Sequence, residues 1–293
     1  MIDINYVYLQ YLLLNDYYCK LKIMNNNVDL GRNYLDRYFS SIRSKGRYTF
    51  TYDELKKQFP LSDAAITQSL SRVKKRGEIV QIRKGFYAII PPEYSIQGIL
   101  PPYLFIDDLL KSLNKPYYVG LLSAAALHGA AHQQPMEYFV IAQTPAPRSI
   151  NNKKLKISFF SKSNWEQTDI EQKITDAGYL NVSSPELTAL DLLTYVDKIG
   201  LNRAVTVLQE LAPTMKVSTL GKTAKRCPST PVIQRLGYLL EKVLGEEKLA
   251  ESLLRELNYR SIIPVLLSTK NKKKGDTDQT WKVIVNMEIE SDL

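Results

Sequence analysis

The stretch LSDAAITQSLSRVKKRGEIVQIRKGFYAII, residues 61–90, decides the fold of the N-terminal part of the chain. Ser62 is a residue type that caps the start of a helix, and Gly77 is the type that follows a helix end. Between them, apolar residues recur at helical spacing and would share one face. These apolar residues are Ile66, Leu70 and Val73. The pattern predicts a helix that ends near Gly77.

A two-stranded hairpin is predicted directly after this helix. The runs EIVQI and FYAII flank Arg83, Lys84 and Gly85, and a three-residue loop with glycine in the special position is a common hairpin connection. A helix, a glycine stop and a hairpin, in that order, form the DNA-reading half of a winged helix-turn-helix. Here the wing would carry two cations at its tip.

Small, polar and basic side chains occupy the face of the predicted helix opposite its apolar residues. They are short near its start and cationic near its end, which suits hydrogen bonds to base edges and contacts with phosphates. We therefore predict that DNA is contacted by Ala64, Thr67, Gln68, Ser71, Arg72 and Lys75 on the helix and by Arg83 and Lys84 on the wing.

The residues before this stretch complete a winged-helix domain over 31–92. Helical spacing of apolar residues predicts a first helix at about 32–44. The sequence from Thr51 to Glu54 is a capping box that opens a short second helix, and Pro60 ends it. Three helices and a hairpin within about sixty residues fit the size of this class of domain.

The positive charge of the chain is concentrated in the same region. Residues 31–90 contain thirteen Lys and Arg against five Asp and Glu, a net charge of +8, whereas the whole chain carries +9. Localised basicity is typical of a nucleic-acid-binding surface. The alternative is that the Lys-Lys-Arg run is only a solvated helix face. However, the helix cap, the spacing of the apolar residues, the hairpin and the net charge all favour DNA binding.

Length and composition set the outer limits. A chain of 293 residues suggests about two domains. The two cysteines, Cys19 and Cys227, are far apart and form no disulfide framework, which favours a reducing compartment, the cytoplasm. No apolar run approaches the roughly 20 residues of a membrane span, so no membrane association is predicted.

The N-terminal extension, residues 1–30, is of uncertain nature. Residues 1–23 are rich in aromatic residues and leucine but lack a basic start and carry Asp3, so they make a poor signal peptide. They are either an added helix on the core or upstream sequence read through from a start before Met24.

A mixed α+β domain is predicted over 105–293, after a proline-rich linker at 93–104 with two Pro-Pro pairs. Short helices are expected at 105–113 and 117–128. In the tail, 257–267 and 281–289 look like two strands added to the C-terminal sheet. The lysine-rich loop 270–274 between them is a weaker candidate for a second phosphate contact.

Several motifs in this order resemble the AbiEi-type antitoxins of type IV toxin–antitoxin systems, first met in phage abortive infection. The resemblance covers about residues 30–245. It rests on KGFYAI at 84–89, PYYVGLLSAAALHGAAHQQP at 116–135, EYFVIA at 137–142, LKISFF at 155–160, SSPELTALDLL at 183–193 and QRLGYLLE at 234–241.

The resemblance implies a protein that represses its own operon through the winged helix, at inverted repeats in promoter DNA. It also implies that the C-terminal domain counters a cognate nucleotidyltransferase toxin, without requiring a stable complex. The family motif residues are Ser123, His128, His132, Glu186 and Arg235. The alternative function is a winged-helix regulator whose C-terminal domain senses something else and has no toxin partner.

The motif residues have physical interpretations of their own. His128 and His132 have the i, i+4 spacing that can bind zinc, but Gly129 suggests that the helix ends there and no cysteine lies close in sequence. We therefore predict no metal site, and expect a ring that caps carbonyls or packs in a turn. Glu186 belongs to the start of an amphipathic helix. Arg235 is either structural or a contact for a partner.

The sequence favours a protein that is not an enzyme and needs no cofactor. A nucleotidyltransferase requires a Gly-Ser turn with an Asp-x-Asp nearby, and no such pair follows Gly120 and Ser123. Asp276 and Asp278 have the spacing but belong to a polar loop. A serine-hydrolase elbow and a Walker loop are both absent from the sequence.

Overall fold

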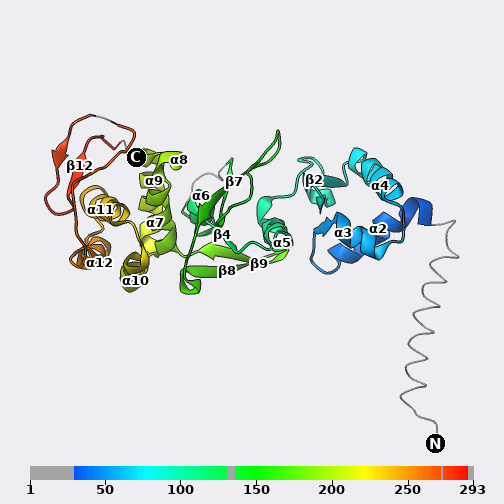
Figure 1. Ribbon diagram of the computed structural model, residues 1–293, viewed down its shortest axis with the longest axis horizontal. Coiled ribbons are helices and arrows are strands. Elements are labelled where there is room, and N and C mark those ends of the chain that lie inside the picture. Colours follow the sequence, from blue (N-terminus) through cyan, green and yellow to red (C-terminus); the bar gives the residue numbers. More distant parts are fainter. Residues whose placement is uncertain (1–29, 131–135, 272, 290–293) are drawn as a thin grey trace, which may run out of the picture. The chain divides into compact units, whose positions relative to one another are not determined.

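The computed structural model describes residues 30–130, 136–271 and 273–289 (Figure 1). The expectations for residues 1–29 and for His132 fall outside these ranges. The chain divides into two compact units, one ending at Gly98 and the other starting at Ile99, with Ile82–Lys84 grouped with the second. Within the described residues, every helix is too short or too polar to span a bilayer.

The N-terminal elements form three helices and a small sheet. In chain order they are α2 (Leu30–Arg43), β1 (Thr49–Thr51), α3 (Tyr52–Gln58), α4 (Asp63–Lys75), β2 (Ile79–Arg83) and β3 (Phe86–Ile89). The sheet order is β1-β3-β2, and β1 pairs with β3 in antiparallel register. This is the arrangement of a winged helix-turn-helix, with β2 and β3 as the wing.

The predicted helix boundaries are confirmed by their caps. The Thr51 hydroxyl accepts from the Glu54 amide at 3.1 Å, and the Glu54 carboxylate accepts from the Thr51 amide at 2.7 Å. The Ser62 hydroxyl accepts from the Ala65 amide at 3.3 Å. Gly77 and Gly85 have φ values of 79° and 76°, which glycine adopts without strain. Both ends of α4 and the wing turn are therefore set by local sequence.

The proline-rich segment predicted as a linker, 93–104, forms a short helical turn at each end. Two short 3₁₀ helices, η1 (Pro92–Tyr94) and η2 (Pro102–Leu104), begin with proline in the first turn, where its missing N–H is not needed. Leu100 and Leu104 are buried. The proline-rich segment therefore contains two short helical turns.

The C-terminal unit is built on a six-stranded mixed sheet of order β6-β7-β5-β4-β9-β8. The pairs β5–β7 and β4–β9 are parallel, and β4–β5, β6–β7 and β8–β9 are antiparallel. The strands are β4 (Tyr117–Val119), β5 (Tyr138–Gln143), β6 (Ile150–Asn151), β7 (Lys156–Lys162), β8 (Ile170–Thr175) and β9 (Gly178–Ser183). The overall class is thus α+β, as the sequence predicted.

One predicted helix, 117–128, is a strand followed by a helix. Tyr117–Val119 forms β4 in the middle of the sheet, and α6 (Leu121–Leu127) begins after Gly120. Aromatic and β-branched residues favour a strand, and the three residues of β4 are buried. A Cβ on Gly120 would lie 2.9 Å from Ile141 Cδ1, so the turn between strand and helix needs glycine.

Helices flank this sheet in Figure 1, the first of them on one side and the others on the opposite side. They are α5 (Ile106–Ser112), α7 (Pro185–Thr194), α8 (Val196–Ile199), α9 (Leu201–Leu211), α10 (Val217–Arg226), α11 (Thr230–Tyr238), the π turn η5 (Leu239–Val243) and α12 (Glu247–Leu257). The helix α7 was expected to be amphipathic, but all its residues from Pro185 to Leu193 are buried. It packs against α6, α9, α10 and α11, which accounts for the burial of its residues before Thr194.

The tail forms a separate sheet rather than an extension of the six-stranded one. Its strands are β10 (Val265–Leu266), β11 (Asp276–Thr277) and β12 (Val283–Val285), in the order β10-β12-β11. The expectation of strands added to the main sheet was wrong. The predicted strand at 257–267 was too long, since α12 runs on to Leu257, whose side chain is buried on the apolar face of that helix.

Candidate functional site

The predicted reading residues of α4 share one exposed face. Ala64, Thr67, Gln68, Ser71, Arg72 and Lys75 are all exposed, whereas Ile66, Leu70 and Val73 are buried in the core of the unit. A shallow hollow lies over the first half of this face, lined by Asp63, Ala64, Ala65, Thr67, Gln68 and Ser71. On the wing, Lys84 is exposed and Arg83 is half-buried.

The cations near the end of α4 differ in how they are paired. Arg76 binds Glu78 at 2.6 Å and Asp36 at 3.4 Å. In contrast, no carboxylate of the described residues forms an ion pair with Arg72, Lys74 or Lys75. Three exposed positive charges on this helix are therefore available to an anionic partner.

Two of the family motif residues make buried structural hydrogen bonds. The Ser123 hydroxyl accepts from the Phe139 amide at 2.9 Å, which ties α6 to β5. A Glu186 carboxylate oxygen accepts from the Lys216 amide at 2.7 Å, just before α10. Both side chains are buried, so they position elements of the unit rather than face solvent.

The other two described motif residues, in contrast, bind backbone carbonyls. Nε2 of His128 lies 2.7 Å from the Ser183 carbonyl, and burial lowers the pKa of the ring. His128 thus binds a carbonyl, which is one of the two roles expected for a histidine ring of this motif. Nε of Arg235 donates to the Leu266 carbonyl at 2.8 Å, which ties α11 to β10. Of the two roles predicted for Arg235, this hydrogen bond supports the structural role over a contact with a partner. Within the described ranges, no group of three potential metal ligands comes together.

A pocket of about 680 Å³ lies in the C-terminal unit. Its lining comes mainly from the end of β7, the helix α7 and the loop that joins α10 to α11. It is lined by Ser161, Lys162, Ser163, Asn164, Trp165, Glu166, Asp169, Leu187, Leu190, Asp191, Thr194, Tyr195, Thr223, Arg226, Cys227, Pro228 and Ser229.

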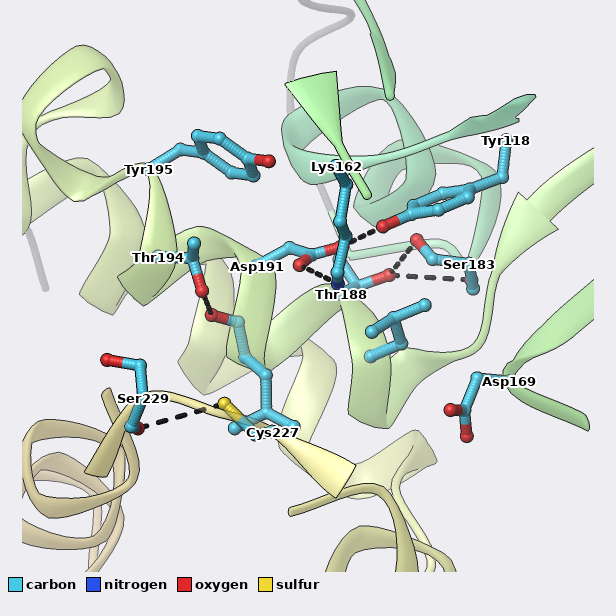
Figure 2. A network of polar contacts seen from close by, with 12 residues as sticks. Tyr118, Lys162, Asp169, Ser183, Thr188, Asp191, Thr194, Tyr195, Cys227 and Ser229 are labelled. Atoms are coloured by element: carbon cyan, nitrogen blue, oxygen red, sulfur yellow. Dashed lines mark hydrogen bonds and ion pairs between the residues drawn. The ribbon is translucent and has the colours of Figure 1, made fainter. Parts of the chain in front are cut away.

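Asp191 of α7 is the centre of a buried polar network at this pocket (Figure 2). Its two carboxylate oxygens accept from Lys162 Nζ and from the Tyr118 hydroxyl, both at 2.7 Å. Burial raises the pKa of Asp191, and the positive charge of Lys162 opposes that rise. The pKa of Tyr118 is raised as well, first by burial and then by the neighbouring carboxylate.

A second buried carboxylate, Asp169, faces the same pocket. It accepts from the Thr223 hydroxyl at 2.8 Å and is bound by two nitrogens of Arg226. Cys227 follows directly, and burial raises the pKa of its thiol. The thiol is therefore held in its protonated form, which is a poor nucleophile.

Sequence reasoning missed this pocket. The one available signal was Asp191, a single carboxylate within the apolar run 187–193. A carboxylate on a fully buried helix needs hydrogen-bond or ion-pair partners. Lys162 and Asp169 carried no signal, because they lie in ordinary polar contexts and meet α7 and α10 only through the fold.

The two units define a class of protein: a winged helix-turn-helix followed by a mixed α+β domain. Residues 118–242 match the model of the AbiEi antitoxin C-terminal domain family. This match confirms the resemblance seen in the motifs over residues 118–242.

Among solved structures, the RV2827C protein from Mycobacterium tuberculosis is similar, with a TM-score of 0.60 and 20% identity. The match covers 85% of this chain and 90% of that chain, and it shows a shared fold. An antigenic nucleotidyltransferase-like protein from Paracoccidioides brasiliensis matches with a TM-score of 0.33 and 11% identity, over 52% of this chain and 89% of that chain. A likeness that weak carries no argument. No curated protein matches the chain.

Proposed function

We propose that this protein is the antitoxin of a type IV toxin–antitoxin system. It represses its own operon by binding promoter DNA and counteracts a cognate nucleotidyltransferase toxin in the cytoplasm. The match of residues 118–242 to the AbiEi antitoxin domain carries the antitoxin half of this proposal. The exposed face of α4, with its unpaired cations, supports the DNA-binding half.

In this proposal α4 enters the major groove. Thr67, Gln68 and Ser71 face base edges, while Arg72, Lys75 and the wing residue Lys84 contact phosphates. Two copies of the chain would read the two halves of an inverted repeat, because half-site symmetry mirrors the symmetry of a bound dimer.

The C-terminal unit acts against the toxin without itself being an enzyme. The buried carboxylates Asp169 and Asp191 are each neutralised by a cation, and the Cys227 thiol is kept protonated by burial. These are features of a stable binding scaffold. Counteraction of the toxin does not require a lasting complex between the two proteins.

A second candidate function is a winged-helix regulator whose C-terminal unit senses a ligand and has no toxin partner. The pocket at Asp191 favours this alternative, since a cavity of that size suits a small molecule. A nucleotidyltransferase reading frame next to the gene supports the antitoxin, and its absence supports the sensor.

DNA binding is tested by the salt dependence of affinity for the promoter. Arg72→Ala/Lys75→Ala should weaken binding to every sequence and reduce the slope of log affinity against log salt by about one unit per lost phosphate contact. The matched control is Lys222→Ala/Lys225→Ala, which removes two exposed lysines at the same spacing from α10. If both double variants bind like the wild type, α4 is not the DNA-binding helix.

A further inference from the structure

In the pocket of the C-terminal unit, the two buried carboxylates are paired with protein donors, and the cations that pair with them keep some N–H groups unused. The Asp191 side chain is 1% exposed and that of Asp169 is 5% exposed. Both oxygens of each carboxylate already accept hydrogen bonds from the protein. The buried carboxylates therefore have little capacity left for a ligand.

The cations that neutralise these carboxylates have N–H groups that are not used in hydrogen bonds to the protein. Lys162 is 23% exposed and Arg226 is 36% exposed, and both line the pocket. Nζ of Lys162 donates one hydrogen bond, to Asp191, out of the three it can make. Arg226 uses Nε and Nη2 for Asp169, and its Nη1 donates to none of the described residues. Of the charged groups that line the pocket, Glu166 is an exposed carboxylate, whereas Lys162 and Arg226 are donors with unused N–H groups.

An aromatic wall stands beside these donors. Trp165 is half-buried, lines the pocket and meets the ring of Tyr118 edge-on, with the ring centroids 5.1 Å apart. Its Nε1 makes no hydrogen bond with the described residues, so it is a further donor. Leu187 and Leu190 of α7 add apolar surface to the same cavity.

We propose that this pocket binds an organic anion that joins a flat apolar body to a carboxylate, phosphate or sulfonate group. The body lies against Trp165, and the anionic group accepts hydrogen bonds from Lys162 and Arg226, whose planar fork suits such groups. Asp169 and Asp191 hold these two cations in place and do not touch the ligand. The volume of about 680 Å³ is in the range of small-molecule sites.

The test uses the full chain and two fluorescent probes with the same ring system. Anilinonaphthalene sulfonate carries the anionic group, and phenylnaphthylamine lacks it. The sulfonate should bind at least tenfold more tightly. Charge is varied on the probe because removal of Lys162 or Arg226 would leave a buried carboxylate unpaired and endanger folding. Equal affinity for the two probes overturns the anion-binding claim.

Position is tested with a variant that fills the pocket. Thr194 is exposed in the last turn of α7 and lines the cavity. Thr194→Phe should weaken sulfonate binding at least tenfold, whereas Thr194→Val, which leaves the volume unchanged, should bind like the wild type. Unchanged binding by Thr194→Phe places the probe elsewhere and overturns the proposal.

Protection of Cys227 provides a readout that needs no pocket variant. This half-buried thiol lines the cavity. In a Cys19→Ser background, saturating sulfonate should slow its reaction with a maleimide at least fivefold, and phenylnaphthylamine at the same concentration should have little effect. If sulfonate binds without slowing this reaction, the pocket is not its site.

Discussion

The ring of Trp281 lies so close to the backbone of Gly237 that a Cβ atom on that glycine would be 1.9 Å from Cζ3 of the ring. Trp281 is fully buried and precedes β12, and Gly237 belongs to α11. The Trp281 indole N–H also donates to Glu241 in the following π turn. This contact joins the three-stranded sheet of the tail to the helical part of the unit.

Substitution of Gly237 should therefore destabilise the protein although alanine favours helices. Gly237→Ala forces the buried Trp281 ring to move, and overpacking of this kind costs about 1–3 kcal/mol or more in the free energy of unfolding. The matched control is Gly221→Ala in α10, where the nearest atom to a Cβ is 3.8 Å away. The control should gain about 0.5–1 kcal/mol. Urea unfolding of the two variants checks both signs, and a stable Gly237→Ala contradicts the packing of the tail.

The ion pair between Lys162 and Asp191 should give a stability effect that depends on pH. Burial raises the folded-state pKa of Asp191 above its unfolded value, and Lys162 limits the rise. The protonated carboxyl of Asp191 therefore contributes its whole stabilising effect below the unfolded-state pKa of about 3.9. This contribution is lost as pH rises through the folded-state pKa. Lys162→Met raises that pKa further, so its cost should be about 3 kcal/mol at pH 8 and smaller at pH 5.

Urea unfolding of wild type and Lys162→Met at the two pH values measures this difference, and the effects of other titrating groups cancel between the two proteins. Lys111→Met is the control, because Lys111 pairs with Asp107 at the surface and is 71% exposed. It should change stability by less than about 1 kcal/mol at both pH values. An equal cost of Lys162→Met at pH 5 and pH 8 would show that Asp191 does not titrate as the burial requires.

His128 should titrate below the usual range of histidine. Burial is the largest cause of its lowered pKa, and the Ser183 carbonyl can only accept, so Nε2 carries the hydrogen. The stability from this neutral ring is present above the unfolded pKa of about 6.5 and is lost as pH falls through the folded pKa. An NMR titration with His132→Gln for assignment gives the value directly. A pKa at or above 6.5 contradicts the buried position of the ring.

Gln68 should set one position of the operator. A glutamine amide can bind both N6 and N7 of adenine, which discriminates by about 1–3 kcal/mol. Gln68→Ala should relax preference at one base pair per half-site and leave the salt slope unchanged. Gln58→Ala, at the end of α3, is the control for loss of an amide from the same unit. Affinities across a series of single base substitutions check the outcome, and an unchanged preference in Gln68→Ala moves the reading surface away from α4.

Local sequence signals were sufficient for the winged helix. The capping box from Thr51 to Glu54, the cap at Ser62 and the turns at Gly77 and Gly85 each depend on a few neighbouring residues. The structure places each of them as the sequence predicted. Where short-range chemistry determines an element, its ends can be predicted from residue types alone.

The pocket and the arrangement of the tail depend on distant contacts. Asp191 meets Lys162 from β7 and Tyr118 from β4, and no spacing in the sequence brings these three together. Residues Tyr117–Val119 were predicted to be helical but form a strand. Their place between β5 and β9 is set by pairing with strands later in the chain, which the local sequence does not reveal. The tail strands were likewise assigned to the wrong sheet, since the contact of Trp281 with Gly237 has no signature in either segment.

The separation of repression from toxin rescue tests the proposed function most directly. Arg72→Ala/Lys75→Ala would be expressed from an unrelated promoter beside the cognate toxin, at a protein level matched to the wild type. We predict that growth is rescued while repression of the native promoter is lost, because residues 118–242, which match the AbiEi domain, are separate in the chain from the basic helix. If every variant that loses DNA binding also loses rescue at equal protein level, the two activities are not separable and the proposal is contradicted.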